Sequence, residues 1–157
     1  MKKYSVPKNF RSSIGHNSLD NYQSLRENAK KDSNYYWESV AERIDWFEKW
    51  TTVNSTDYSK AHIEWFSNGK LNASYNCIDR HIENGLGEKT ALIWQSNDPT
   101  ISTNVTYNEL LEKVSLFANG LKRAGIKKGD RVCIYMQMIP EAIVAMLACA
   151  RIGAVHS

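Results

Sequence analysis

RVCIYMQMIPEAIVAMLACARIGAVHS, residues 131–157, is the stretch that decides the fold class. Its first six residues, Arg131 to Met136, form a nearly continuous apolar run, which is typical of a strand buried on both faces. Pro140 and Glu141 suit the first turn of a helix, because proline loses no hydrogen bond there and the carboxylate complements the helix dipole. A second strand is expected from Ala154-Val155. The order strand, helix, strand predicts a parallel sheet with a right-handed crossover, and therefore an α/β fold.

A helix is predicted directly upstream of this unit. Thr106-Tyr107-Asn108-Glu109 is a capping box, and apolar residues then recur with helical spacing as far as Leu121. Gly125 supplies a left-handed stop. Gly120 and Gly125 have the separation of the two glycines in a phosphate-binding loop, but Ile126-Lys127 stands where that motif requires Lys and then Ser or Thr. The sequence therefore favours a helix end here over a phosphate site.

The middle of the chain contains a further helix and a short strand. Residues 72–83 can form a helix closed by Gly85, and Thr90 to Trp94 is a short apolar strand. Cys77 and His81 stand one helical turn apart, which suits two metal ligands. A structural zinc site needs four ligands, and no CxxC or second close pair is present, so no metal site is predicted.

Aromatic residues are concentrated in one segment. Nine of the 17 aromatics fall between Tyr35 and Phe66, a range that carries six acidic and three basic residues. A stacking platform for bases or sugars is one interpretation, but the net negative charge would repel a phosphate backbone. The alternative, which we favour, is an irregular collar that anchors itself through large rings, among them Trp46 and Trp65.

The N-terminal residues are basic. Residues 1–31 hold seven basic and two acidic groups, whereas the remainder is slightly acidic, giving a net charge of +3. Residues 1–18 show no periodicity and are expected to be coil, with helices predicted over Leu19 to Lys31 and from Ser33 onward. The leader weakly resembles a mitochondrial transit peptide, but Pro7 and the few apolar residues argue against an amphipathic helix. A nucleic-acid-binding role is not expected, because the excess charge lies in a leader and not on a folded face.

Composition places the chain among globular proteins. It has 157 residues, 42% hydrophobic and 24% charged, which suits a single core. The longest apolar run is too short to cross a bilayer. The odd cysteine count predicts free thiols and a reducing, cytoplasmic compartment, and we expect all three cysteines, Cys77, Cys133 and Cys149, to be buried. A parallel sheet needs several strands and cover on both faces, so two candidate strands lead us to expect a fragment whose uncovered apolar faces cause self-association.

Five segments of the chain match one family in the same order and with the same gaps: residues 65–81, 91–94, 106–110, 129–132 and 135–157. Together they resemble the AMP-forming acetyl-CoA synthetases (acetate–CoA ligases) of the adenylate-forming superfamily. Asn76-Cys77-Ile78-Asp79-Arg80-His81 favours the acetate enzymes over the acetoacetate ones, and the resemblance runs from Tyr22 onward. Gln137 and Asn68 depart from it, where Pro and Gly are common.

The resemblance implies an N-terminal fragment with three parts. Residues 1–21 would be a basic flexible leader, residues 22–80 a helical, aromatic-rich collar, and residues 81–157 the incomplete start of the AMP-binding domain, with its first β-α-β units.

In function, the family joins acetate to ATP, forms acetyl-adenylate, and passes the acetyl group to CoA, with Mg²⁺ as the cofactor. The family's phosphate loop, nucleotide and CoA contacts and catalytic lysine would all lie beyond Ser157. We therefore assign no catalytic, cofactor-binding or metal residue here, expect no membrane or nucleic-acid partner, and expect the chain alone to be inactive scaffold. A free-standing interaction module made from the collar is the alternative.

Overall fold

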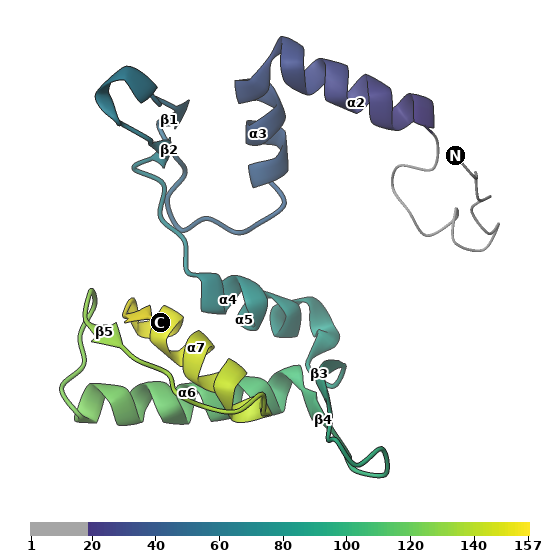
Figure 1. The fold of residues 1–157 in the computed structure, drawn as a ribbon, viewed down its shortest axis with the longest axis vertical. Helices are drawn as coiled ribbons and strands as arrows, with labels where there is room; N and C mark the ends of the chain where they lie inside the picture. The colour runs from purple at the N-terminus through teal and green to yellow at the C-terminus, as the bar shows by residue number, and fades with distance from the viewer. Residues whose placement is uncertain (1–18) are drawn as a thin grey trace. The chain divides into compact units, whose positions relative to one another are not determined.

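The computed structural model describes residues 19–157, which form two compact units (Figure 1). Unit 1 reaches to Arg43 and resumes over Thr51–Ser67, and unit 2 comprises Ile44–Trp50 and Asn68–Ser157. The predicted leader, residues 1–21, lies outside the described residues except for its last three, which begin the first helix. Helices and small sheets are mixed along the chain, in agreement with an α/β class.

Two consecutive helices open unit 1. Helix α2 spans Leu19–Lys31 and helix α3 spans Ser33–Ala41, which confirms both predicted helices. The N-cap of α3 is Asp32, whose side chain accepts a hydrogen bond from the backbone N–H of Tyr35 at 2.9 Å. An aspartate at this position satisfies one of the free N–H groups of the first turn.

A hairpin that sequence reasoning missed completes unit 1. Strand β1 (Thr52–Asn54) pairs antiparallel with strand β2 (Trp65–Ser67), and the 3₁₀ turn η1 (Tyr58–Lys60) lies in the loop between them. The Trp37 ring of α3 meets the Trp65 ring of β2 edge to face, with centroids 5.9 Å apart. The aromatic collar therefore contains regular structure.

The helix expected over residues 72–83 is interrupted. Helix α4 spans Ala73–Cys77 and helix α5 spans Asp79–His81, and the π-helical turn η2 follows over Ile82–Leu86. The break falls at Ile78, where φ is −127° and the side chain is fully buried. Gly85 has φ 78°, so the left-handed stop predicted there is confirmed.

A second antiparallel hairpin leads into the longest helix. Strand β3 (Thr90–Gln95) was predicted almost to its bounds, whereas its partner, strand β4 (Ser102–Thr106), was not. Helix α6 spans Tyr107–Arg123 and begins with the predicted capping box, in which Thr106 and Glu109 each accept from the other's backbone N–H. At its end the N–H of Ile126 donates to the Leu121 carbonyl at 3.1 Å, a Schellman closure around Gly125. Gly120 and Gly125 therefore belong to a helix end, as predicted.

The two C-terminal strands pair in parallel, as expected. Strand β5 (Arg131–Val132) pairs in parallel with strand β6 (Val155–His156), and helix α7 (Pro140–Ile152) connects them. The predicted strand over residues 131–136 is wrong in length and burial, because the ladder assigns two residues and Tyr135 is 100% exposed. A strand is buried on both faces only when layers cover both, and the described residues place one neighbouring strand beside β5.

The core of unit 2 lies where α6 and α7 pack together, with α4 also against α7. Small residues on α7 permit close approach, and Ala148 is fully buried. The buried cluster consists of Ile78, Val105, Leu110, Val114, Ala118, Val144 and Ala148.

Candidate functional site

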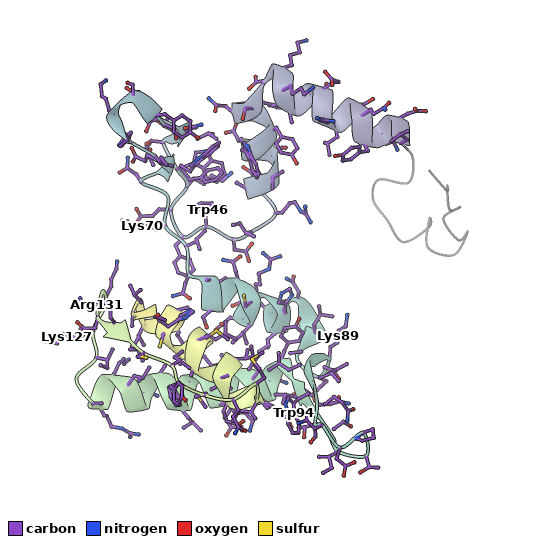
Figure 2. All side chains as sticks on the ribbon, in the orientation of Figure 1. Trp46, Lys70, Lys89, Trp94, Lys127 and Arg131 are labelled. Carbon is purple, nitrogen blue, oxygen red and sulfur yellow. The ribbon has the colours of Figure 1, made fainter. Side chains whose placement is uncertain are left out.

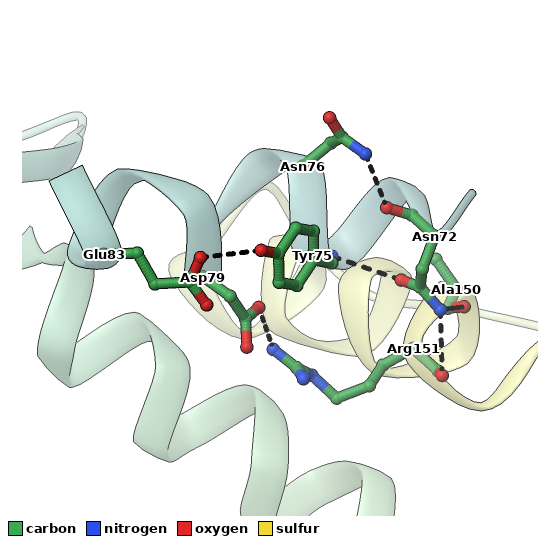
Figure 3. Close-up of polar contacts among 7 residues, drawn as sticks. All are labelled: Asn72, Tyr75, Asn76, Asp79, Glu83, Ala150 and Arg151. Carbon is green, nitrogen blue, oxygen red and sulfur yellow. Dashed lines mark hydrogen bonds and ion pairs between the residues drawn. The ribbon is translucent and has the colours of Figure 1, made fainter. Parts of the chain in front are cut away.

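A network of polar side chains joins α4 and α5 to the end of α7, and Asn72 is its centre (Figure 3). The Asn72 carboxamide oxygen caps α4 by accepting from the N–H of Tyr75 at 3.2 Å. The amide nitrogen of the same side chain donates to the carbonyls of Ala150 and Arg151, at 3.2 and 3.1 Å. These carbonyls lie in the last turn of α7, where the regular helix hydrogen bonds run out, although the Ala150 carbonyl also accepts from the N–H of Gly153 at 3.2 Å. One side chain therefore caps two helices, although Asn72 and Ala150 are 78 residues apart in sequence.

An ion pair reinforces the same junction. The Arg151 guanidinium donates through Nη2 to the Asp79 carboxylate, and the two side chains are 25% and 20% exposed. The Arg151 Nε is buried and has no hydrogen-bond partner among the described residues. A partly buried pair of this kind fixes geometry, since removing one partner leaves an uncompensated charge.

Asn76 holds the segment Ile44–Trp50 against α4. Its side-chain oxygen accepts from the N–H of Asp45 at 2.8 Å, and its amide nitrogen donates to the Asp45 carbonyl at 2.9 Å. The ring of Phe47 packs edge to face on Tyr75, with centroids 5.3 Å apart. The segment Ile44–Trp50, which precedes the rest of unit 2 in sequence, is therefore held in unit 2 by these contacts.

Tyr75 acts as a donor in this network. Its hydroxyl donates to Glu83 Oε2 at 2.6 Å, and this hydrogen bond, followed by burial and nearby carboxylates, raises the pKa of Tyr75 to about 12. The phenol therefore stays protonated at neutral pH and has no capacity to act as a general base.

The three cysteines and His81 do not form a common site within the described residues. The ring of His81 lies against Tyr107, with centroids 5.0 Å apart, and the described residues include no group of three His, Cys, Asp or Glu side chains placed to hold a metal. Cys149 is buried and burial raises the pKa of its thiol, as expected for a core residue. The expectation of buried thiols is wrong for Cys77 and Cys133, which are exposed because neither lies on a covered face. That Cys77 and His81 bind no zinc stays a prediction.

A serine, a histidine and a glutamate meet in the loop of the β1–β2 hairpin, a group that sequence reasoning did not find. Ser55 Oγ donates to Glu64 Oε2 at 2.9 Å, while His62 Nε2 lies 3.3 Å from the same carboxylate oxygen and 3.5 Å from the serine. A nucleophilic triad needs its two imidazole nitrogens to face different partners. Here one nitrogen faces both, and all three side chains are in exposed contacts, so the group stabilises the hairpin and activates no nucleophile.

An apolar pocket of about 130 Å³ lies between β3 and the start of α7. The indole N–H of Trp94 donates to the Met138 carbonyl at 2.8 Å beside it. Figure 2 shows Trp94 at the β3 end of unit 2. The pocket presents apolar side chains and no set of convergent polar groups, so it offers no chemistry. Its lining residues are Leu92, Ile93, Trp94, Met138, Ile139, Pro140, Ala142, Ile143 and Met146.

No helix within residues 19–157 has the length and apolar character needed to cross a membrane.

Two family models match the chain. Residues 22–77 match the acetyl-coenzyme A synthetase N-terminus, and residues 79–157 match the AMP-binding enzyme family.

Curated relatives cover the same region. An acetyl-coenzyme A synthetase of Magnetococcus marinus is 52% identical over 161 residues, covering 100% of this chain and 24% of the relative. The protein of that name from Alkalilimnicola ehrlichii is 48% identical over 99% of this chain and 24% of its own length. A third, from Rhizobium rhizogenes, is 53% identical over 87% of this chain. The chain thus spans about a quarter of the length of the relatives it matches.

Proposed function

Because the chain belongs to the AMP-binding enzyme family and carries the N-terminal region of the acetyl-coenzyme A synthetases, we propose that it is the N-terminal portion of an acetate–CoA ligase. The observation that carries the proposal is the 52% identity to such a synthetase along the whole chain. The two family matches, over residues 22–77 and 79–157, support the same proposal along nearly the whole described chain.

The proposed reaction has two steps. The acetate carboxylate attacks the α-phosphorus of ATP, forming acetyl-adenylate and releasing pyrophosphate. The thiol of CoA then attacks the acetyl carbonyl, forming acetyl-CoA and releasing AMP. Both steps build negative charge that must be stabilised by positioned donors and cations.

Within this reaction we assign residues 19–157 a scaffold role. The polar side chains of the network centred on Asn72 bind one another: Asn72 caps two helices, and Tyr75 donates to Glu83. Asp79 holds Arg151 in place. These contacts hold the elements of unit 2 together. The absence of catalytic, cofactor-binding and metal residues from this chain is part of the proposal.

Mg²⁺ is the cofactor that we propose for the whole enzyme, held with the phosphates of ATP. Magnesium prefers hard oxygen ligands. The described residues bring no three His, Cys, Asp or Glu side chains together, so they do not fit a protein-held Mg²⁺ site and no step is derived through the ion here. Acetate, ATP and CoA are the proposed small-molecule partners, and the three unpaired cysteines support a reducing compartment such as the cytoplasm.

Self-association is proposed for the chain on its own. Tyr135, Met138 and Ile93 are 100%, 86% and 77% exposed, and apolar side chains at this exposure favour contacts with another molecule. A monomeric gel-filtration peak with cooperative unfolding would contradict it.

The test of function is acetate-dependent exchange between ATP and pyrophosphate. The intact protein is expected to catalyse exchange that requires acetate, whereas the purified 157-residue chain is expected to match a boiled control. Exchange by the chain alone would show that residues assigned to the scaffold include a catalytic set. Exchange by the intact protein with other carboxylates and not with acetate would refute the proposed substrate.

A further inference from the structure

A polar hollow of about 520 Å³ lies between the last turns of α6 and of α7. It is separate from the network centred on Asn72, with Arg151 as the one residue common to both. Its lining residues are Ser115, Ala118, Asn119, Lys122, Arg151 and Ile152.

Three polar residues of the hollow come from one face of α6. Ser115, Asn119 and Lys122 are spaced i, i+4 and i+7, so their side chains lie one above another on the helix. Within residues 19–157, the side chains of Ser115 and Asn119 form no hydrogen bond and Lys122 forms no ion pair. A hydroxyl, an amide and an ammonium group are therefore available to a ligand on one helix face.

Arg151 brings a second cation from α7. A guanidinium has five N–H donors, and Arg151 commits Nη2 to Asp79. The Nε is buried, so only the terminal nitrogens can reach a ligand. With its side chain three-quarters covered, Arg151 is held by Asp79 and presents a fixed cation to the hollow.

The surrounding sequence adds positive charge. Residues 122–131 contain five basic residues and one acid, Asp130, whose carboxylate accepts from the N–H of Lys127. The aliphatic stem of Lys128 lies against Gly153, directly after α7, because a Cβ on that glycine would come within 2.9 Å of Lys128 Cγ. Figure 2 shows Lys127 and Arg131 at this same end of α6.

The local charge balance favours an anion. The two helix ends contribute roughly half a negative charge each, and Asp79 contributes one more. Lys122, Arg151 and Lys128 together outweigh these contributions by about one positive charge. Basic residues in a last turn also complement the helix dipole, a role in which Ser115 and Asn119 take no part.

We propose that the hollow between α6 and α7 is a binding site for a small phosphate-type oxyanion. Lys122 and Arg151 supply the charge, and Asn119 and Ser115 supply neutral donors on one side of the anion. The ion pair with Asp79 already orders the Arg151 side chain, so anion binding loses less side-chain entropy. The inference does not depend on the proposed acetate activation.

Inorganic phosphate is the probe, titrated calorimetrically into the intact protein at constant ionic strength. Lys122→Gln removes the ammonium from an exposed position where folding is not at risk, and is expected to weaken binding about tenfold, as for the loss of one charge-assisted hydrogen bond. Lys113→Gln is the matched control, because Lys113 lies on the same helix nine residues away and therefore on the opposite face. It should leave the affinity unchanged. Asn119→Ala is expected to weaken binding about threefold without altering the net charge.

Several outcomes would overturn the proposal. Equal weakening in both lysine variants would show diffuse attraction to a basic surface, and equal binding of chloride would show screening alone. An unchanged affinity in both Lys122→Gln and Asn119→Ala would place phosphate elsewhere on the protein. Undetectable phosphate binding to the folded wild-type protein at tens of millimolar would remove the site altogether.

Discussion

Replacing Asn72 by alanine tests the claim that one side chain caps two helices. The substitution removes the N-cap of α4, which typically costs about 1 kcal/mol. It also removes two hydrogen bonds to the last turn of α7, each worth roughly 0.5 to 1.5 kcal/mol. We therefore expect the free energy of unfolding to fall by about 3 kcal/mol. With a urea m-value near 2 kcal/mol/M, the unfolding midpoint should drop by roughly 1.5 M at unchanged slope.

Asn72→Asp separates the two caps. The carboxylate can still accept from the N–H of Tyr75, so the cap of α4 is retained, but it has no N–H to donate to Ala150 or Arg151. We expect about two-thirds of the loss seen with alanine. In hydrogen exchange, the Tyr75 amide should stay protected in the aspartate variant and lose protection in the alanine variant.

Asn84→Ala is the matched control for these variants. Asn84 makes a single exposed hydrogen bond, from its amide nitrogen to the Arg80 carbonyl at 2.7 Å, so its loss should cost well under 1 kcal/mol. If Asn72→Ala destabilised the protein no more than this control, the double cap would contribute nothing and the reasoning would be refuted. A wild-type midpoint in Asn72→Asp would equally exclude the contacts to α7.

Four further predictions concern single residues. Thr106→Ala breaks the capping box of α6 and should cost about 1 kcal/mol in urea denaturation, whereas Thr106→Gly should cost less, because glycine leaves the first N–H groups of the helix open to water. Glu83→Gln should move the titration of Tyr75, followed by ultraviolet absorbance, from about 12 toward its ordinary value. Because the folded-state pKa is the higher one, the stabilisation from this pair is present below pH 10 and lost as the pH rises through 12, and the variant should lack that loss. Trp65→Ala should lower the free energy of unfolding by less than the ~3 to 5 kcal/mol of a fully buried tryptophan, since Trp65 is 38% exposed. It should change stability more than the acetate KM. Val114→Ala, in the core, should lower the free energy of unfolding by about 2 kcal/mol.

Local signals in the sequence located α6 accurately. The capping box at Thr106 and Glu109 and the glycine at position 125 act through neighbours within a turn or two, so their partners can be read from adjacent residues. Helix α7 was equally accessible, because Pro140 is favoured at a first helical position and Gly153 at the residue after a helix end. Where both ends of an element carry such residues, its bounds follow from the sequence.

The two hairpins escaped prediction because their pairing is not local in the same sense. Strand β4 alternates serine, threonine, asparagine and valine, and its first three residues are exposed, so it carries little hydrophobic pattern. Strands β1 and β2 have three residues each and are joined by a loop with its own 3₁₀ turn. Periodicity over three residues does not distinguish a strand from coil.

The junction at Asn72 lies further still from what a sequence reveals. Asn72 was recognisable as the start of a helix, and the structure confirms that role. Nothing adjacent to Asn72 indicates that its amide nitrogen meets Ala150 and Arg151, because the partners are backbone carbonyls of a helix end more than 70 residues away. The collar was predicted to anchor through rings, and ring contacts are present. Six aromatic side chains within residues 22–80 nevertheless remain exposed: Tyr22, Tyr35, Trp37, Phe47, Tyr58 and Trp65.

The error over residues 131–136 separates two properties that an apolar run is usually taken to predict together. Backbone pairing continues past β5: the N–H of Ser157 donates to the Val132 carbonyl at 3.1 Å, and the N–H of Ile134 donates to the Ser157 carbonyl at 2.7 Å. The chain thus follows a strand path as far as Ile134, while Cys133 is exposed and Tyr135 is fully exposed. Hydrophobicity and β-propensity specify the backbone path, because a pleated chain needs only one neighbour to form its ladder. Burial is a property of the layers above and below, and no residue within the run itself determines whether those layers are present.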